Sequence, residues 1–160
     1  MTVQASSIRD LEADAGMKAL LPGAQFADAF RVAVNDDPLT ARQAAERMFL
    51  RLPHWIGGLM KLRNLVVAPL GLKTPSHAKT IAADSIGPFP VISDTPHRLV
   101  AGFDDRHLDF RVIVDVTGSP PHRQVTATTL VMTHNLLGRV YLATIMPFHR
   151  IIVPAMLRQV

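Results

Sequence analysis

Residues that could do chemistry interrupt the apolar C-terminal stretch of this chain, residues 136–157. Tyr141 and His149 lie eight positions apart, about two helical turns, so both project from roughly the same side of a helix. In an apolar site they would supply a hydrogen-bond donor and a group that titrates near neutral pH. A core histidine that satisfies its own helix, beside a surface Arg150, explains the same residues without a ligand. Both interpretations stay open.

His134 and Arg63 are further candidates at the ends of predicted elements. His134 and Asn135 end a strand just before the final helix, where they could stand at a cavity mouth, or where Asn135 could simply cap the helix. Arg63 could anchor a ligand carboxylate, cover the last carbonyl groups of its helix, or pair with Asp84 or Asp94.

Large or adaptable apolar side chains could shape a pocket. Trp55 follows Pro53 and is costly to leave in water, so we expect it to anchor a helix in the core or to line a pocket. Met132 fits either an adaptable core or a pocket wall. Asp109 and Arg111 share one side of a predicted strand, which favours cross-strand ion pairing.

The sequence contains no established catalytic or metal-binding motif. It lacks H-E-x-x-H, G-x-S-x-G, G-x-G-x-x-G and a complete phosphate loop, and its seven histidines never fall at i, i+4 on one helix. The absence of cysteine excludes disulfides, thiolate chemistry and cysteine-based zinc sites. We therefore expect no metal and no cofactor, and we assign no catalytic residue.

Composition predicts one domain with a sizeable core, because 160 residues contain 48% hydrophobic and 19% charged side chains. The net charge of +4 comes from scattered Arg and Lys without interleaved aromatic residues, so we expect no nucleic-acid partner. A cysteine-free chain without a signal-like N-terminal pattern fits the cytoplasm, where we expect this protein to act.

The C-terminal stretch also raises the question of a membrane span, which needs about 20 predominantly apolar residues. Arg139 and the pair His149-Arg150 divide it and leave only Val140 to Phe148 uninterrupted. Because central charges are costly in a bilayer, we expect no transmembrane segment. Contact with a membrane surface stays open.

Periodicity and turn residues predict the order of the elements. We expect an N-terminal segment (1–24) followed by a single domain (25–160). The domain is expected to begin with a strand at 25–34, a helix at 40–52, a second helical stretch at 54–67 weakened at Gly57-Gly58, and a loop at 68–88. Strands at 89–96, 97–105, 106–118 and 123–135 and a final helix kinked at Pro147 and Pro154 are expected to follow. The alternation at 107–117 leaves one apolar strand face, and the final helix is the element available to cover it. The sequence therefore predicts the α+β class.

Several stretches resemble a known family, namely RLPHWIGGLMKLRN (51–64), GLKT (71–74), GFDDRHLDFRV (102–112) and THNLLGRVY with PFHRIIVPAML (133–157). They are similar to an uncharacterised, mostly bacterial domain-of-unknown-function family within or near the START-like helix-grip superfamily. That superfamily includes lipid-transfer domains and polyketide cyclases. The resemblance implies a curved antiparallel sheet, a helix pair near the N-terminus, and a long C-terminal helix gripped by the sheet over a hydrophobic cavity.

Three functions follow as hypotheses. The first is a module that binds a small hydrophobic molecule; its cavity is expected to be lined by Phe110, Val112, Val114, Leu130, Met132, Tyr141, Ile145, Phe148 and His149, with Trp55, Arg63 and His134 as further contacts. The second is an enzyme of cyclase, dehydratase or isomerase type that uses Tyr141 or His149 as acid or base. The third is an interaction domain without a cavity, whose final helix docks a partner or forms a homodimer.

Overall fold

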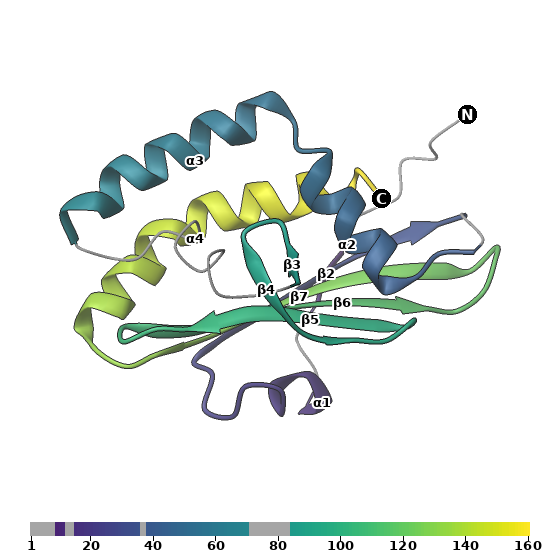
Figure 1. The fold of residues 1–160 in the computed structure, drawn as a ribbon, viewed down its shortest axis with the longest axis horizontal. Coiled ribbons are helices and arrows are strands. Elements are labelled where there is room, and N and C mark those ends of the chain that lie inside the picture. The colour runs from purple at the N-terminus through teal and green to yellow at the C-terminus, as the bar shows by residue number, and fades with distance from the viewer. Residues whose placement is uncertain (1–8, 12–14, 36–37, 71–83) are drawn as a thin grey trace.

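The computed structural model describes residues 9–11, 15–35, 38–70 and 84–160, and its strands form an antiparallel sheet (Figure 1). The strand order is β1-β2-β7-β6-β5-β4-β3, in which β1 is a three-residue addition to the β2 edge. The strands are β1 (Arg9–Leu11), β2 (Phe26–Val34), β3 (Ser85–Ile86), β4 (Phe89–Asp94), β5 (Arg98–Asp104), β6 (Leu108–Thr117) and β7 (Arg123–Thr133).

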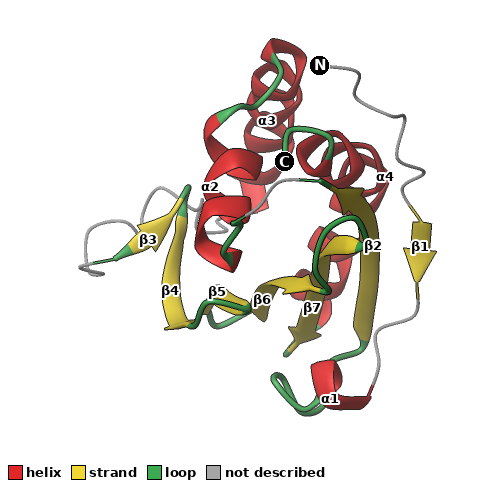
Figure 2. Cartoon of the chain, turned by 90° about the vertical axis from the view of Figure 1, so that its right-hand side faces the viewer, coloured by secondary structure: helices red, strands yellow, loops and turns green. Residues whose placement is uncertain are grey.

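The larger helices lie together on one face of this sheet, whereas α1 lies on the other (Figures 1 and 2). The helices are α1 (Ala15–Lys18), α2 (Ala41–Leu50), α3 (His54–Val67), which continues into a short 3-10 turn η1 (Ala68–Leu70), and α4 (Leu136–Leu157). The predicted α+β class is therefore confirmed, with two helices between the first long strand and the antiparallel strands and a long C-terminal helix on the sheet. The short strands β1 and β3 and the unbroken course of α3 through Gly57-Gly58 were not predicted.

The core lies between the sheet and the helices. Alternate residues of β6 and β7, among them Val112, Val114 and Val125, face α2 and the C-terminal end of α4. The buried face of α2 consists of Ala41, Ala44, Ala45 and Met48. Because three of these four side chains are a single methyl group, α2 can approach the sheet closely.

A second, smaller cluster covers the opposite face of the sheet. Ile113 breaks the polar side of the β6 alternation, and here it packs with Leu21, Val100 and Leu130. The segment that follows α1 thus shields the one apolar residue that the alternation left on the outer face. Asp115, on the same face, accepts hydrogen bonds from Arg98 at 2.6 and 3.3 Å.

Polar side chains cap the N-termini of α2 and α4. Thr40 and Gln43 form a capping box at α2, and the Asn135 side chain accepts a hydrogen bond from the Gly138 N–H at α4, which is one of the two alternatives left open for Asn135. Each cap satisfies backbone N–H groups that lack a partner within the helix.

Arg42 ties α2 to the β3–β4 edge of the sheet. Its Nη2 lies 2.5 Å from Asp84 Oδ2 and its Nε 2.5 Å from Asp94 Oδ2. Hydrogen bonding to Arg42 lowers the pKa of the Asp84 carboxyl below its usual value, while Asp84 and then Asp94 raise the pKa of Arg42. The predicted partner of these two carboxylates, Arg63, is therefore replaced by Arg42; the Arg63 side chain lies outside the described part of the chain.

Helix α4 is one continuous helix of 22 residues that contains both Pro147 and Pro154 and curves across the sheet (Figure 1). Its N-terminal turn touches the turn between β5 and β6. A Cβ atom placed on Gly138 would lie 2.0 Å from the His107 carbonyl oxygen, so only glycine permits this approach. The Gly138 contact thus fixes where α4 starts over the sheet.

We expect Gly138→Ala to lower the free energy of unfolding by about 1–3 kcal/mol, because a backbone oxygen cannot move aside as a side chain would. Gly58→Ala is the matched control, since a Cβ atom at Gly58 meets nothing within 4 Å. In the exposed middle of α3 it should stabilise the protein by about 1 kcal/mol or less. Urea denaturation measures both changes, and equal behaviour of the two variants would contradict the contact.

Candidate functional site

A cavity of about 190 Å³ lies between the sheet and the middle of α4. Alternate side chains of the two central strands form its floor: Leu108, Phe110 and Val112 from β6, and Ala127, Thr129 and Val131 from β7. Its roof consists of α4 residues from Tyr141 to Met156, and α2 and α3 contribute Met48, Phe49 and Ile56. The cavity is therefore built from strands and helices that are far apart in the sequence.

Aromatic rings make up one wall. Phe89 packs against Phe110 with ring centroids 4.9 Å apart, stacks on Phe103 at 6.2 Å, and meets the edge of Phe49 at 5.8 Å. These rings come from β4, β6, β5 and α2. A wall of large, mutually packed rings is stiff and apolar, and it suits an apolar occupant.

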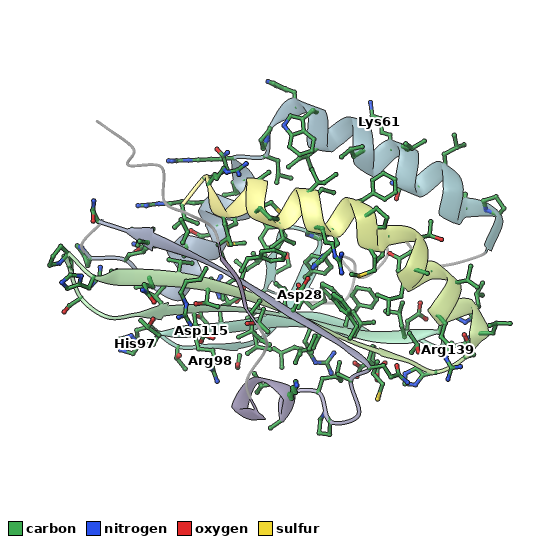
Figure 3. The ribbon with its side chains drawn as sticks, turned by 180° about the vertical axis from the view of Figure 1, so that it is seen from behind. Asp28, Lys61, His97, Arg98, Asp115 and Arg139 are labelled. Carbon is green, nitrogen blue, oxygen red and sulfur yellow. The ribbon has the colours of Figure 1, made fainter. Side chains whose placement is uncertain are left out.

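The opposite side of the cavity carries a buried polar pair. His149 Nε2 lies 2.9 Å from Asp28 Oδ2 and 3.1 Å from Asp28 Oδ1, and only 15% and 13% of the two side chains are exposed. The imidazole also contacts Phe26, edge to face, with centroids 5.8 Å apart. Figure 3 shows Asp28 on β2 beneath α4.

The chemistry of the pair follows from its partners. An ionised carboxylate only accepts hydrogen bonds, so Nε2 of His149 donates to Asp28 and, in the neutral imidazole, Nδ1 is left as an acceptor. Asp28 lies opposite Thr129 in the β2–β7 register, and Thr129 lines the cavity. Polar side chains from β2, β7 and α4 thus lie close together, and two of them, Thr129 and His149, line the otherwise apolar cavity.

Asp28 was not among the residues predicted from the sequence. The signal that could have found it is its parity, because Phe26, Phe30 and Val32 of the same strand face the helices. A single acid within such an apolar row must either find a partner under the covering helix or distort the strand. His149 is that partner, so it pairs across the core instead of satisfying the carbonyl groups of its own helix.

Five of the predicted site residues do line the cavity: Phe110, Val112, Tyr141, Ile145 and His149. The same is true of Phe148. Val114 faces the same side but is fully buried in the core.

Met132 and Leu130 lie on the opposite face of the sheet, in the cluster around Ile113. The physical reason is strand parity, since Thr129 and Val131 are the β7 residues that face α4. The expectation that Met132 lines the cavity is therefore corrected.

Trp55 is 46% exposed, so the expectation of a core or pocket position is also corrected. The next residue, Ile56, is 1% exposed and lines the cavity in its place. Helix α3 is apolar on more than one side, and the sequence could not show which side turns inward.

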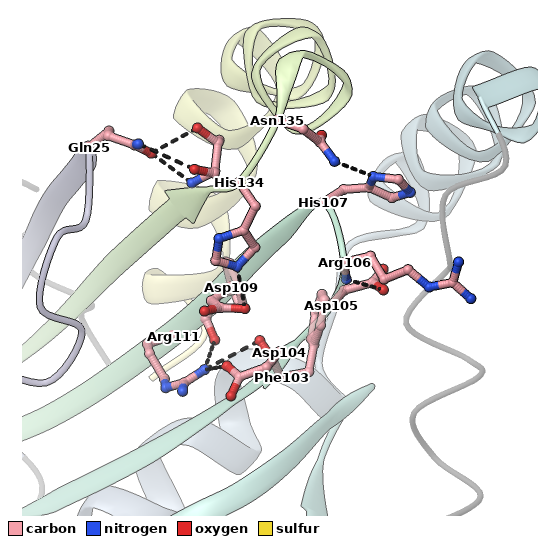
Figure 4. A network of polar contacts seen from close by, with 12 residues as sticks. Gln25, Phe103, Asp104, Asp105, Arg106, His107, Asp109, Arg111, His134 and Asn135 are labelled. Atoms are coloured by element: carbon pink, nitrogen blue, oxygen red, sulfur yellow. Dashed lines mark hydrogen bonds and ion pairs between the residues drawn. The ribbon is translucent and has the colours of Figure 1, made fainter.

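His134 belongs to a polar network where β7 ends and β6 begins, rather than to the cavity (Figure 4). Its Nε2 lies 3.0 Å from Asp109 Oδ1, and Asn135 Nδ2 lies 2.9 Å from His107 Nδ1. Arg111 on β6 forms an ion pair with Asp104 on β5 at 2.7 Å, as predicted, whereas Asp109 meets the imidazole of His134 and not an Arg or Lys side chain. This network joins the β5–β6 turn to the start of α4.

Within residues that the structure describes, no three His, Asp or Glu side chains gather in a way that could hold a metal ion. The polar side chains that line the cavity are those of Thr129, Tyr141 and His149, and the rest of the lining is apolar.

Comparison with known proteins gives one match. A family model described as "Protein of unknown function (DUF2867)" matches residues 20–156 of the chain. No curated protein and no solved structure matches it.

We expect Asp28→Ala to lower the free energy of unfolding by about 1–3 kcal/mol, because it leaves a buried imidazole N–H without an acceptor. Asp109→Ala is the matched control, since its partner His134 is 36% exposed and can turn to water. The Asp109 side chain is itself only 14% exposed, so the two variants differ mainly in whether the histidine left behind can reach water, and we expect a loss of about 1 kcal/mol or less for Asp109→Ala. Urea denaturation at neutral pH compares them, and a smaller loss for Asp28→Ala than for Asp109→Ala would refute the structural weight given to the buried pair.

Proposed function

Because the chain belongs to the DUF2867 family, whose function is unknown, we propose a function from its own geometry: it binds a small apolar or amphipathic molecule between the sheet and α4. One observation carries the proposal. The cavity is apolar and aromatic over most of its surface, yet His149, which is held by the largely buried Asp28, lines one side of it. Ligand pockets combine these features, namely an apolar lining and a few placed polar groups. The cavity also speaks against an interaction domain that lacks one.

The volume of the cavity limits the size of the ligand. An engineered protein cavity of about 150 Å³ stays dry and binds benzene. At about 190 Å³, this cavity suits a single ring with one substituent or a short branched chain. A long acyl chain would need side chains such as Leu142 or Ile152 to move.

The polar end sets the chemical preference. Nδ1 of a neutral His149 accepts a hydrogen bond, so a hydroxyl group on the ligand would be favoured over a methyl group at the same place. The aromatic wall would hold the body of the molecule. The ligand class is thus a small phenol-like or alcohol-like amphiphile.

The arrangement supports a wider assignment that belongs to the same proposal. A curved antiparallel sheet with a long C-terminal helix across it, and a cavity between them, is what the START-like helix-grip fold would provide. Together with the absence of cysteine, this supports a cytoplasmic ligand-binding protein.

The His149–Asp28 pair favours a second candidate, an enzyme that moves a proton. A carboxylate that orients an imidazole through one nitrogen leaves the other to act as a base. For a small ketone in the cavity, the base would take a proton from the carbon next to the carbonyl. An enolate would form, and the proton would return to carbon.

We expect toluene and phenol to raise the Tm of the full chain, since a ligand that binds only the folded state stabilises it by about 2.7 kcal/mol at a hundred times its Kd. Leu142→Trp fills the cavity and should abolish the shift. Ala143→Trp, one position along α4 and exposed, is the control and should keep it. Phenol should bind more tightly than toluene. If Leu142→Trp keeps both shifts, the ligands bind elsewhere and the proposal fails.

The enzyme candidate is tested by deuterium exchange. Acetophenone incubated with the protein in D₂O should lose its methyl protons in the proton NMR spectrum faster than in buffer alone. Asp28→Asn should reduce the rate by about 10²-fold or more, the usual contribution of a positioned base. Exchange at the buffer rate with wild-type protein, together with a thermal shift, would leave binding without catalysis.

A further inference from the structure

The outer side of α3 is apolar where a surface helix is normally polar. Trp55, Leu62 and Leu65 are 46%, 47% and 72% exposed. With Gly58 they follow one another at steps of three and four residues, so they form one stripe along the helix. This stripe points away from Ile56, which faces the cavity.

The outer side of α4 repeats the pattern. Leu136, Val140 and Ile151 are 75%, 45% and 56% exposed, and Ala143 and Pro147 lie exposed between them. Their spacing again keeps them on one side of the helix. Because α3 lies beside α4 on the same side of the sheet (Figures 1 and 2), we refer to the two stripes together as the α3–α4 layer.

The charge of this layer has one sign. Neither helix contains Asp or Glu, while together they carry Lys61, Arg63, Arg139 and Arg150. All thirteen acidic residues of the chain lie outside 47–83 and 116–160. Lys61 extends outward from α3, and Arg139 lies near the start of α4 (Figure 3).

Helix α4 also has the composition of a membrane-contacting helix. Among the described helices it is long and apolar enough to cross a bilayer, with a mean hydropathy of 1.5 over its most apolar window, of which only 22% is buried. Its inner side is already engaged, however, by Asp28 on β2 and by the core around Ala155–Leu157. Surface contact by the outer side is compatible with this packing, whereas crossing the bilayer is not.

We propose that the α3–α4 layer docks on an anionic lipid surface. The exposed Leu, Val, Ile and Trp side chains enter the boundary between headgroups and acyl chains, where Trp is favoured. The Lys and Arg side chains meet lipid phosphates, and each basic residue near an anionic surface strengthens binding by about fivefold. Large exposed apolar patches mark interaction sites in soluble proteins.

The charge and the apolar stripes of the layer favour an anionic lipid surface over a second copy of the chain or a nucleic acid. A second copy of the chain docked through the same layer would set Lys61, Arg139 and Arg150 against identical cations. A nucleic acid would meet the cations but leave the apolar stripes without a role. A lipid surface with negative headgroups uses both features. The proposal needs no ligand in the cavity, so it stands apart from the proposed binding function.

The experiment uses the full chain and two vesicle types, phosphatidylcholine alone and phosphatidylcholine with phosphatidylglycerol. Co-sedimentation measures binding, and Trp55, the only tryptophan, reports the environment of the layer through its fluorescence. We expect binding and a blue shift with the anionic vesicles, weaker binding to the neutral ones, and a loss of affinity as salt is added.

Variants locate the contact. Leu62→Glu with Leu65→Glu, and separately Arg139→Glu with Arg150→Glu, should each reduce the affinity by about 25-fold or more, on the same scale of about fivefold per charge. Ile92→Glu, 53% exposed on β4, and Lys18→Glu, exposed on α1 across the sheet, are the matched controls and should bind as wild type. Circular dichroism confirms that each variant is folded.

Three results would overturn the proposal. One is equal sedimentation with neutral and anionic vesicles, or none with either. Another is a wild-type dimer in analytical ultracentrifugation that Leu65→Glu converts to a monomer, because the layer would then be an interface between copies. Binding that the control variants weaken as much as the helix variants do counts against it too.

Discussion

Helix α4 is held against the sheet at both ends, and most of the molecule's features depend on that constraint. At its start, Gly138 lies directly on the His107 carbonyl, and a single added carbon atom would clash. At its end, Ala155, Met156 and Leu157 enter the core beside α2. Between these points the middle of the helix is separated from the sheet by the cavity. The large rings of Phe89, Phe103 and Phe110 line that cavity. Large rings interdigitate less closely than the alanines with which α2 packs on the sheet. A cavity therefore remains between the sheet and the middle of α4.

Burying the His149–Asp28 pair beneath α4 costs free energy unless both side chains form hydrogen bonds. Removing a carboxylate and an imidazole from water is unfavourable, and their mutual hydrogen bond offsets that loss. The pair therefore adds little to stability by itself, but it fixes the rotation of α4 about its own axis, since only one orientation brings His149 to Asp28. The same rotation directs Tyr141, Ile145 and Phe148 into the cavity.

Once the rotation of α4 is fixed, one side of the helix faces the cavity and the other faces solvent. The inner side provides the roof of the cavity, and the outer side presents Leu136, Val140 and Ile151 with Arg139 and Arg150. A helix that is apolar nearly all round is expected in a buried position or in lipid. Here the sheet and the core cover one side of α4 and leave the other side exposed. The proposed ligand site and the proposed lipid contact are thus two consequences of one placement.

Much of the fold could be predicted from the sequence because each helix and strand depends on patterns within a short stretch of residues. Strand alternation predicted β2 and β4 to β7 within a few residues, and the predicted starts of the second and the final helix lie next to Thr40 and Asn135, which cap them in the structure. Part of the site was predictable for the same reason, since Tyr141, Ile145 and His149 share one side of a recognisable helix. Met132, Trp55 and Asp28 were not placed correctly or were not found. Three features depend on contacts between residues distant in sequence: the face of β7 that turns to α4, the side of α3 that turns inward, and the acid that meets His149.

The sequence by itself determined the elements and their order, because backbone geometry and side-chain period act within a few residues. Only the tertiary structure decided the cavity and its His–Asp pair, because these arise where β2, β6, β7 and α4 meet in space.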